Sequence, residues 1–470
     1  MIGTGQSLSV GTGASIINDE QLYSNLKLED VGPDPKCSLR GSPDWRAVAL
    51  TEPIRRRLAG AGPGYEDNQY PNNIRGESPH SGMANTLSAL WRARTGGSYV
   101  TAHSAVGATG SCLAEISKGS LYRAYRASLL EASAFQALAQ QQGKTFGYAG
   151  IILTNGECDA ANDSFGSALF DFWSDYNADL KAITGQPRDV VLFASQQSSV
   201  AAGQHSSAVQ LWQASNQHPE RIVCVGPKYQ YEYGYDHLHM KGGSYARLGG
   251  KYAEVFDAVV NQKRAWRPLG PTAVSRDGAV IRIDLHVPNP PLRWDSNLEA
   301  PHQVLNTAWA AGRGFEVRGD ALPLAIHDVT IDGSSVLITL DETPALGTQL
   351  EVSYAVTPDG PDFGGGSVLG MRGQLRDSDD FVGDDRETVQ VIVTNGSRVV
   401  SATAARGLKR RSSYDLVSGS GLPDGVVVLS QDSDEQVTLS APWSGETGTV
   451  ELTFQYDHSN YCVHFSMPVR

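Results

Sequence analysis

Over the first 265 residues, short apolar runs alternate with stretches whose apolar residues recur at helical spacing. This alternation restricts the possible folds more than any other feature of the sequence. The apolar runs are expected as buried strands: Ile151–Leu153, Asp189–Ala194 and Arg221–Val225. The helical stretches are Leu121–Gln142, Phe165–Ile183 and Tyr245–Gln262. Such alternation is typical of a parallel sheet covered by helices on both faces, so we predict an α/β domain. In these sheets, sites form at the carboxyl ends of the strands.

The sequence pattern changes after residues 266–271, which read Trp-Arg-Pro-Leu-Gly-Pro. Alternating or β-branched segments separated by turn residues follow: Ala279–Val287, Val329–Ile331, Ser335–Leu340 and Gln349–Tyr354. Beyond the glycines 364–366 lies a second set: Thr388–Thr394, Gly425–Leu429, Gln436–Leu439 and Thr449–Gln455. We therefore expect three domains, namely the α/β domain over 1–265, a β-sandwich over 266–383 and a β-rich C-terminal module over 384–470.

The charge of the chain limits its partners. With 38 Lys and Arg against 51 Asp and Glu, the net charge is −13. This argues against nucleic acid, because neutralising phosphates needs clustered Lys and Arg. The one basic cluster, Lys409–Arg411, is expected to be a solvated turn. No apolar run approaches the roughly 18 residues of a membrane span, and no signal peptide is visible, so no membrane partner is expected and the localisation stays open.

The cysteines do not form a disulfide framework. There are five in 470 residues, and none makes a metal-like Cys-x-x-Cys pair, so we expect reduced thiols and no metal: Cys37, Cys112, Cys158, Cys224 and Cys462. Cys112 and Cys158 each follow a segment assigned below to the site. They are expected to lie near each other, although a disulfide between them is the less favoured outcome.

Three short segments, each at a predicted strand-to-loop junction, supply the groups that acyl transfer needs. Ser7 lies in the segment Gly5–Gly11, where a tight turn can present its hydroxyl. A hydroxyl is a weak nucleophile at neutral pH and needs an adjacent base. Asp236 can hold Nδ1–H of His239, which leaves Nε2 to take the serine proton. Asn155 follows a predicted strand and can donate its amide to a developing oxyanion.

These segments resemble those of the SGNH (GDSL-like) hydrolases. The motifs are GQSxxxG at 5–11, N-G-E-x-D at 155–159 and D-x-x-H at 236–239, and the resemblance covers about residues 1–262. The most similar members are of the sialate O-acetylesterase and acetylxylan esterase type, whose first motif reads GQS rather than GDS. The resemblance implies a flavodoxin-like parallel-sheet hydrolase domain. Because only Met1–Thr4 precede Gly5, we expect either that the first strand is very short or that this chain is a piece of a longer protein.

Carried over residue by residue, the resemblance implies a catalytic triad. Ser7 is the nucleophile, His239 the general base and acid, and Asp236 the carboxylate that orients the histidine. The oxyanion hole comprises the N–H groups of Ser7 and Gly110 and the side-chain amide of Asn155. No metal or organic cofactor is implied.

Two positions in this assignment have alternatives. Gly107 is the second choice for the glycine of the oxyanion hole. Glu157 competes with Asp236 for the acid role, because in some related esterases the corresponding glutamate supports the histidine. Asp236 is favoured.

Several of these residues also have a purely structural interpretation. Ser7 and Asp236 can cap a turn or helix, His239 can be a surface histidine and Asn155 a turn residue. The neighbouring His237 is offset from the catalytic position. Four alternating tyrosines upstream fit a strand or a stacking surface for a sugar ring: Tyr229, Tyr231, Tyr233 and Tyr235.

The function that these residues favour is a serine carbohydrate O-acetylesterase acting on an acetylated polysaccharide or glycan. One alternative is a lipase or thioesterase on the same scaffold. Another is a glycan-binding or virion structural protein with an inactive hydrolase domain. The β-rich part resembles, more weakly, modules appended to esterases in bacterial and bacteriophage polysaccharide-processing proteins. That resemblance makes a homo-oligomer and an extracellular or virion-associated location natural expectations.

Overall fold

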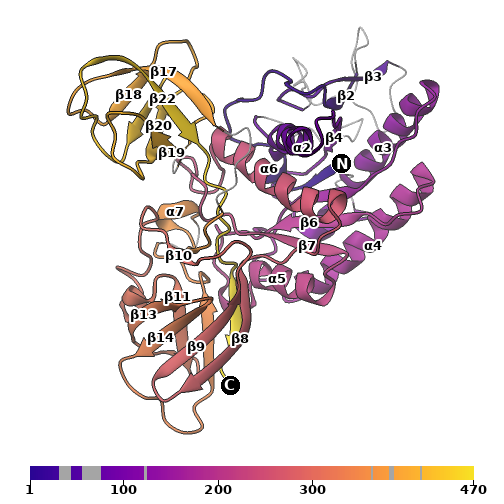
Figure 1. Ribbon diagram of the computed structural model, residues 1–470. Coiled ribbons are helices and arrows are strands. Elements are labelled where there is room, and N and C mark those ends of the chain that lie inside the picture. Colours follow the sequence, from indigo (N-terminus) through magenta and orange to yellow (C-terminus); the bar gives the residue numbers. More distant parts are fainter. Residues whose placement is uncertain (31–43, 55–75, 121–123, 361–363, 380–385, 413–414) are drawn as a thin grey trace.

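The computed structural model describes residues 1–30, 44–54, 76–120, 124–360, 364–379, 386–412 and 415–470 (Figure 1). The N-terminal part contains a seven-stranded sheet in the order β3-β2-β4-β1-β5-β6-β7. Its strands are β1 (Ile2–Gly5), β2 (Leu26–Asp30), β3 (Trp45–Ala49), β4 (Ala102–Ala105), β5 (Gly150–Thr154), β6 (Val191–Ser195) and β7 (Ile222–Gly226). All neighbours run parallel except β2 and β3. The order β4-β1-β5-β6-β7 is the 2-1-3-4-5 order of flavodoxin-like sheets, and the α/β prediction is confirmed.

Helices cover both faces of this sheet, because its strands are apolar on both sides. They are α2 (Pro79–Thr95), α3 (Ala124–Gln141), α4 (Phe165–Thr184), α5 (Ser207–Gln217) and α6 (Gly242–Phe256). Ile151 and Leu153 of β5 pack into the cluster that includes Phe172 of α4. Ile152, between them, packs on the opposite face with Tyr252 of α6. This alternation is the period of two of a strand, and it yields a three-layer domain.

Helices α2 and α6 approach each other closely, which explains the glycines within them. A Cβ on Gly249 would lie 2.1 Å from the Pro79 carbonyl oxygen, and one on Gly82 would lie 2.2 Å from that of Ala246. No larger residue fits at these crossings. The prediction of a closing helix is confirmed despite its glycines, although α6 begins at Gly242 and ends at Phe256.

The middle part is a β-sandwich. One sheet has the order β13-β14-β9-β8, from β8 (Gly270–Asp277), β9 (Val280–His286), β13 (Ile326–Asp332) and β14 (Ser335–Leu340). The other has the order β12-β11-β15-β23, from β11 (Phe315–Gly319), β12 (Leu322–Pro323), β15 (Leu350–Tyr354) and β23 (Phe465–Pro468). A two-stranded sheet of β10 (Arg293–Trp294) and β16 (Leu375–Arg376) and the short helix α7 (Gly366–Leu369) complete it.

The C-terminal sheet has six antiparallel strands in the order β19-β22-β17-β18-β21-β20. They are β17 (Glu387–Val393), β18 (Val399–Ala402), β19 (Leu416–Ser418), β20 (Val428–Ser433), β21 (Gln436–Leu439) and β22 (Gly448–Gln455). Our division counted everything from 384 to 470 with this module, and its boundary near 383 lies outside the described residues. The last strand, β23, instead pairs with β15 of the sandwich. The chain therefore returns to the sandwich after β22.

This return path runs along the α/β domain. Lys251 of α6 donates to the His458 carbonyl at 2.7 Å, and Tyr229 donates to the Cys462 carbonyl at 2.6 Å. The N–H of His464 donates to the side chain of Gln196 at 3.0 Å. These buried contacts join the end of the chain to the α/β domain.

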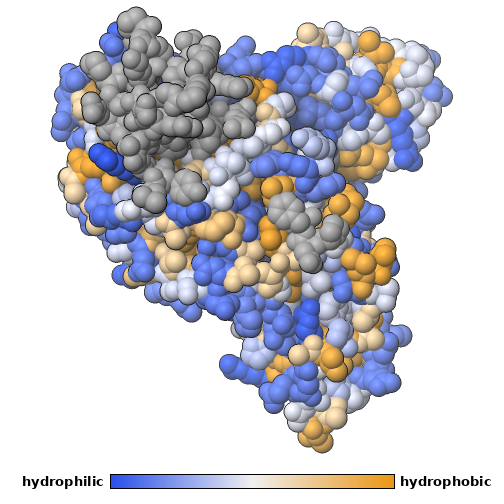
Figure 2. All heavy atoms as spheres, turned by 180° about the vertical axis from the view of Figure 1, so that it is seen from behind, coloured by the Kyte–Doolittle hydropathy of each residue, from blue (hydrophilic) through white to orange (hydrophobic). Residues whose placement is uncertain are grey.

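The surface is mixed in character. On the face shown in Figure 2, blue and white areas surround small separate orange areas. The exposed apolar side chains include Val304, Leu305 and Leu346, and scattered exposure of this kind is normal. Among the described residues, no helix combines the length and hydropathy that a membrane span requires.

Candidate active site

Ser7 lies at the carboxyl end of the central strand β1, at the start of a short 3-10 helix over Ser7–Ser9. Gly5 has φ +138°, and a Cβ there would lie 2.1 Å from the Thr154 carbonyl oxygen, so only glycine fits. The Gln6 N–H donates to that same oxygen at 3.3 Å. The turn that carries Ser7 is thereby attached to the end of β5.

Asp236 and His239 lie on the loop between β7 and α6. His239 Nδ1 lies 2.7 Å from Asp236 Oδ2, and Oδ1 accepts the N–H groups of Leu238 at 3.1 Å and His239 at 3.0 Å. Burial alone would raise the pKa of Asp236, but these hydrogen bonds outweigh it and hold that pKa below its ordinary value. Asp236 is therefore ionised at neutral pH and fixes the orientation of the imidazole.

The second ring nitrogen of His239, Nε2, differs from Nδ1 in its hydrogen bonding. Among the described residues, its Nε2 is buried and has no hydrogen-bond partner. Ser7 and His239 are thus not hydrogen-bonded to each other in this structure. In enzymes without substrate, such catalytic hydrogen bonds are often long and tighten only in the complex.

The Ser7 loop and the His239 loop nevertheless contact each other. A Cβ on Gly13 would lie 3.3 Å from Cβ of His239. The Thr12 N–H donates to the Ser7 carbonyl at 3.1 Å, and Tyr245 of α6 donates to the Thr12 carbonyl at 3.2 Å. The structure therefore brings the first and third sequence motifs to one end of the sheet.

Gly107 and Gly110, the two candidates for the glycine of the oxyanion hole, lie on the loop after β4, beside the Ser7 turn. A Cβ on Gly107 would lie 2.2 Å from Oγ of Ser9, so Gly107 permits the close approach of the two loops. Gly110 has φ +74°, and no atom lies within 4 Å of the place its Cβ would take. Asn155, at the end of β5, donates through Nδ2 to the Ser111 carbonyl at 3.1 Å, while its buried Oδ1 has no partner among the described residues. An amide has two N–H donors, so one remains.

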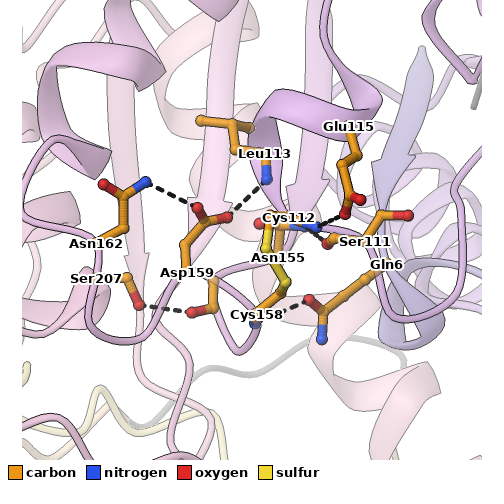
Figure 3. Close-up of a disulfide and its surroundings, with 11 residues drawn as sticks. Gln6, Ser111, Cys112, Leu113, Glu115, Asn155, Cys158, Asp159, Asn162 and Ser207 are labelled. Carbon is orange, nitrogen blue, oxygen red and sulfur yellow. Dashed lines mark hydrogen bonds between the residues drawn. A yellow bond between two sulfur atoms is a disulfide. The ribbon is translucent and has the colours of Figure 1, made fainter. Parts of the chain in front are cut away.

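A disulfide joins Cys112 to Cys158 (Figure 3), and our expectation of reduced thiols is wrong for this pair. Its two Cα atoms are 4.8 Å apart, within the usual range. Cys224 and Cys462 are free and buried, and Cys37 lies outside the described residues. Spacing alone did not favour the bond, because the partners are 46 residues apart.

The disulfide belongs to a set of contacts that joins the loops after β4 and β5. In Figure 3, Asp159 accepts the Leu113 N–H at 2.6 Å, and Cys158 donates to the Gln6 side chain at 3.3 Å. Asp159 therefore has a structural role. These contacts hold the segments of Gly110 and Asn155 against the Ser7 turn.

As the acid of the triad, Glu157 would have to contact His239, but its carboxylate contacts Lys228 instead. Its Oε1 lies 2.6 Å from Nζ of Lys228, and both side chains are buried. The carboxylate that contacts His239 is that of Asp236. Lys228 is not recognisable as the partner of Glu157 from the sequence, because a lone lysine after an apolar strand carries no signal of what it contacts.

The tyrosines upstream of Asp236 divide into two kinds. Tyr229, Tyr231 and Tyr233 are buried, whereas Tyr235 is 97% exposed. The segment forms an isolated bridge between Tyr233 and Met240 rather than a strand. Three of the four are therefore core residues, and only Tyr235 offers a ring face to a ligand.

The β-sandwich contributes a loop to this site, which the sequence did not suggest. The Gly365 N–H donates to the His237 carbonyl, and that of Gly364 donates to the Ser199 carbonyl at 2.9 Å. A Cβ on Gly365 would lie 2.6 Å from the Tyr233 ring. His237 itself is exposed, with φ +53°, and its backbone receives the loop.

The sequence motifs lie at the ends of strands of the parallel sheet, as the resemblance implied. The chain resembles the SGNH hydrolases. No family model matches its sequence, and no curated protein matches it. Among solved structures, a protein of Arabidopsis thaliana is similar at 14% identity and a TM-score of 0.38, over 54% of this chain and 95% of that one. A carbohydrate acetylesterase from Xanthomonas citri is similar at 13% identity and a TM-score of 0.47, over 78% of this chain and 77% of that one. NanS is similar at 11% identity and a TM-score of 0.34, over 56% of this chain and 97% of that one.

The position of Asn155 leads to a prediction. Asn155→Ala should lower kcat for p-nitrophenyl acetate by about 10²–10³, the usual cost of removing one oxyanion donor. Asn162 is a suitable control, because it lies on the same loop and its amide donates to Asp159 at 2.9 Å. Asn162→Ala should keep most of the activity. Near-full activity in Asn155→Ala would remove this residue from the oxyanion hole.

Proposed function

We propose that the chain is a serine esterase that removes O-acetyl groups from a polysaccharide or glycan. The observation that carries the proposal is the Asp236–His239 pair: Nε2 of this histidine has no partner among the described residues, and its loop contacts the loop of Ser7. A nucleophile, a base and a carboxylate that orients the base are the groups acyl transfer requires.

In the proposed reaction, Ser7 Oγ attacks the acetyl carbonyl carbon while Nε2 of His239 takes its proton. Asp236 stabilises the imidazolium that forms. The negative charge on the carbonyl oxygen is held by the N–H groups of Ser7 and Gly110 and by the Asn155 amide. The bond from carbon to the sugar oxygen then breaks, and His239 protonates the leaving hydroxyl.

The second half of the reaction repeats these steps with water. His239 takes a proton from a water molecule, which attacks the acetyl-serine. The oxyanion is held by the same donors, acetate leaves, and His239 returns the proton to Ser7. Every proton transfer in this scheme uses a group of the chain itself.

The surroundings of the site favour a sugar over a long acyl chain. The loop around Ser7 is rich in Gly and Ser and the loop around Asp236 is rich in Tyr, rather than in the aliphatic residues that a lipid-binding groove would need. Tyr235, directly before Asp236, is almost fully exposed and offers an aromatic face for a sugar ring. These features support a carbohydrate ester over the lipase or thioesterase alternative.

Ester hydrolysis by the full chain tests the proposal. We expect faster hydrolysis of p-nitrophenyl acetate than of the octanoate ester, together with release of acetate from an acetylated glycan such as acetylxylan. Tyr235→Ala should raise KM for the glycan and leave the nitrophenyl acetate rate unchanged. Preference for the octanoate would support a lipase, and no hydrolysis of any ester would support a binding protein with an inactive hydrolase domain.

A further inference from the structure

A cavity of about 350 Å³ lies between the α/β domain and the C-terminal sheet. One side is formed by small residues on facing turns of α2 and α6, including Gly82, Ala246 and Gly250. The other side comes from residues around β17 and from the segment at 410–411. Figure 1 shows the C-terminal sheet beside α6.

The lining of this cavity is basic, although the chain as a whole carries a charge of −13. Four arginines line it: Arg247 of α6, and Arg386, Arg410 and Arg411 from the C-terminal part. Among the described lining residues, Glu387 is the one carboxylate, and it pairs with Arg411 at 2.5 Å. The expectation that Lys409–Arg411 is a solvated turn is wrong for Arg411, which is buried.

Two of these guanidinium groups have unused donors. The side chains of Arg247 and Arg411 are 9% and 7% exposed. Arg247 forms an ion pair through Nη2 with the buried Asp415, and its charge lies over the Tyr456 ring at 4.8 Å. Among the described residues, Nε and Nη1 of Arg247 and Nε of Arg411 have no hydrogen-bond partner. A buried donor without an acceptor is costly, so such groups normally have a partner.

The cationic groups also lie close enough to affect one another. Burial lowers the pKa of Arg411, and the nearby charges of Arg247 and Arg410 act in the same direction. Asp415 and Glu387 offset this only in part. A negative ligand in the cavity would reduce the repulsion among the arginines.

We propose that this cavity binds an oxyanion, with a small acidic sugar as the ligand class that best fits its size. Planar guanidinium groups match the geometry of carboxylate and sulfate oxygens. A volume of about 350 Å³ falls at the lower end of small-molecule sites, which suits one monosaccharide unit. The proposal is independent of the esterase activity, because none of its residues belongs to the catalytic set.

Calorimetric titration of the full chain with glucuronate, glucose and sodium sulfate tests this assignment. We expect glucuronate to bind at one site per chain and glucose not to bind, because only the former carries the carboxylate. Sulfate binding tighter than that of glucuronate would retain the anion site but overturn the acidic sugar as its ligand. The absence of binding by both glucuronate and sulfate would overturn the proposal.

Variants locate the binding in the cavity. Arg410→Gln and Arg247→Lys should each weaken glucuronate binding on the order of tenfold or more, the usual effect of losing a hydrogen bond to a charged group. The lysine keeps a positive charge beside Asp415, which protects the fold. Arg282→Gln is the control, since Arg282 lies on β9 and pairs with Asp284 and Asp332. Variants that bind glucuronate as the unmodified chain does, with unchanged Tm, would place the site elsewhere.

Discussion

Ser7→Ala should lower kcat/KM for p-nitrophenyl acetate by a factor on the order of 10⁴–10⁶ and leave the Tm nearly unchanged. The reason is that the proposed acetyl intermediate forms on the Ser7 hydroxyl, and residues of a triad act as a unit. Ser7 Oγ makes no hydrogen bond that the structure shows, so its removal costs little stability. Initial rates on the ester and a thermal melt of the same preparation measure both effects.

Ser9 provides the matched control for this experiment. It lies in the same 3-10 helix and is as buried as Ser7, at 3% exposure. Its Oγ donates to the Gln6 carbonyl at 2.6 Å. Ser9→Ala should cost about 1 kcal/mol of stability and retain most of the activity. Equal rates for Ser7→Ala and the unmodified chain would contradict the nucleophile assignment, and an equal loss in both variants would indicate that the turn, rather than the hydroxyl, matters.

The sequence predicted those strands of the α/β domain whose burial is expressed as an apolar run. Ile151–Leu153 and the runs in β6 and β7 have this property, and all three appear in the sheet. Strand β4 does not, because it reads Ala-His-Ser-Ala. Its His103 is buried through a contact of 3.1 Å with His80 of α2, and burial lowers the pKa of His80 to about 3. A polar strand whose partner lies 23 residues earlier, on another element, carries no local signal.

In the candidate site, too, local sequence patterns were predictable and contacts between distant residues were not. Its three motifs were predictable because each lies at a strand end, where a parallel sheet gathers functional groups. The features that were missed join residues far apart in sequence: the disulfide, the Lys228–Glu157 pair and the contact of Gly365 with the His237 backbone. The return of β23 to β15 belongs with them, since it spans the whole C-terminal sheet. No periodicity or short motif encodes such contacts.

Asp236→Asn should lower activity with little effect on stability, whereas Glu157→Gln should lower stability and leave the triad intact. This contrast decides which carboxylate orients His239. In Asp236→Asn, the amide cannot hold the imidazole in the required tautomer and charge, so kcat should fall by about 10⁴. Because the Asp236 side chain is 34% exposed, the Tm should change little. Ester hydrolysis and thermal unfolding of the variant measure the two quantities.

In Glu157→Gln, the buried Lys228 loses its counter-charge. Removing one partner of a buried ion pair costs about 3–5 kcal/mol, so the urea midpoint should fall while the folded enzyme keeps its triad. Adding Lys228→Met to Glu157→Gln should restore much of the stability, because it removes the uncompensated charge. Loss of activity at an unchanged midpoint in Glu157→Gln, together with an active Asp236→Asn, would reverse the assignment. The structure favours Asp236, since its carboxylate contacts His239 at 2.7 Å while that of Glu157 is held by Lys228.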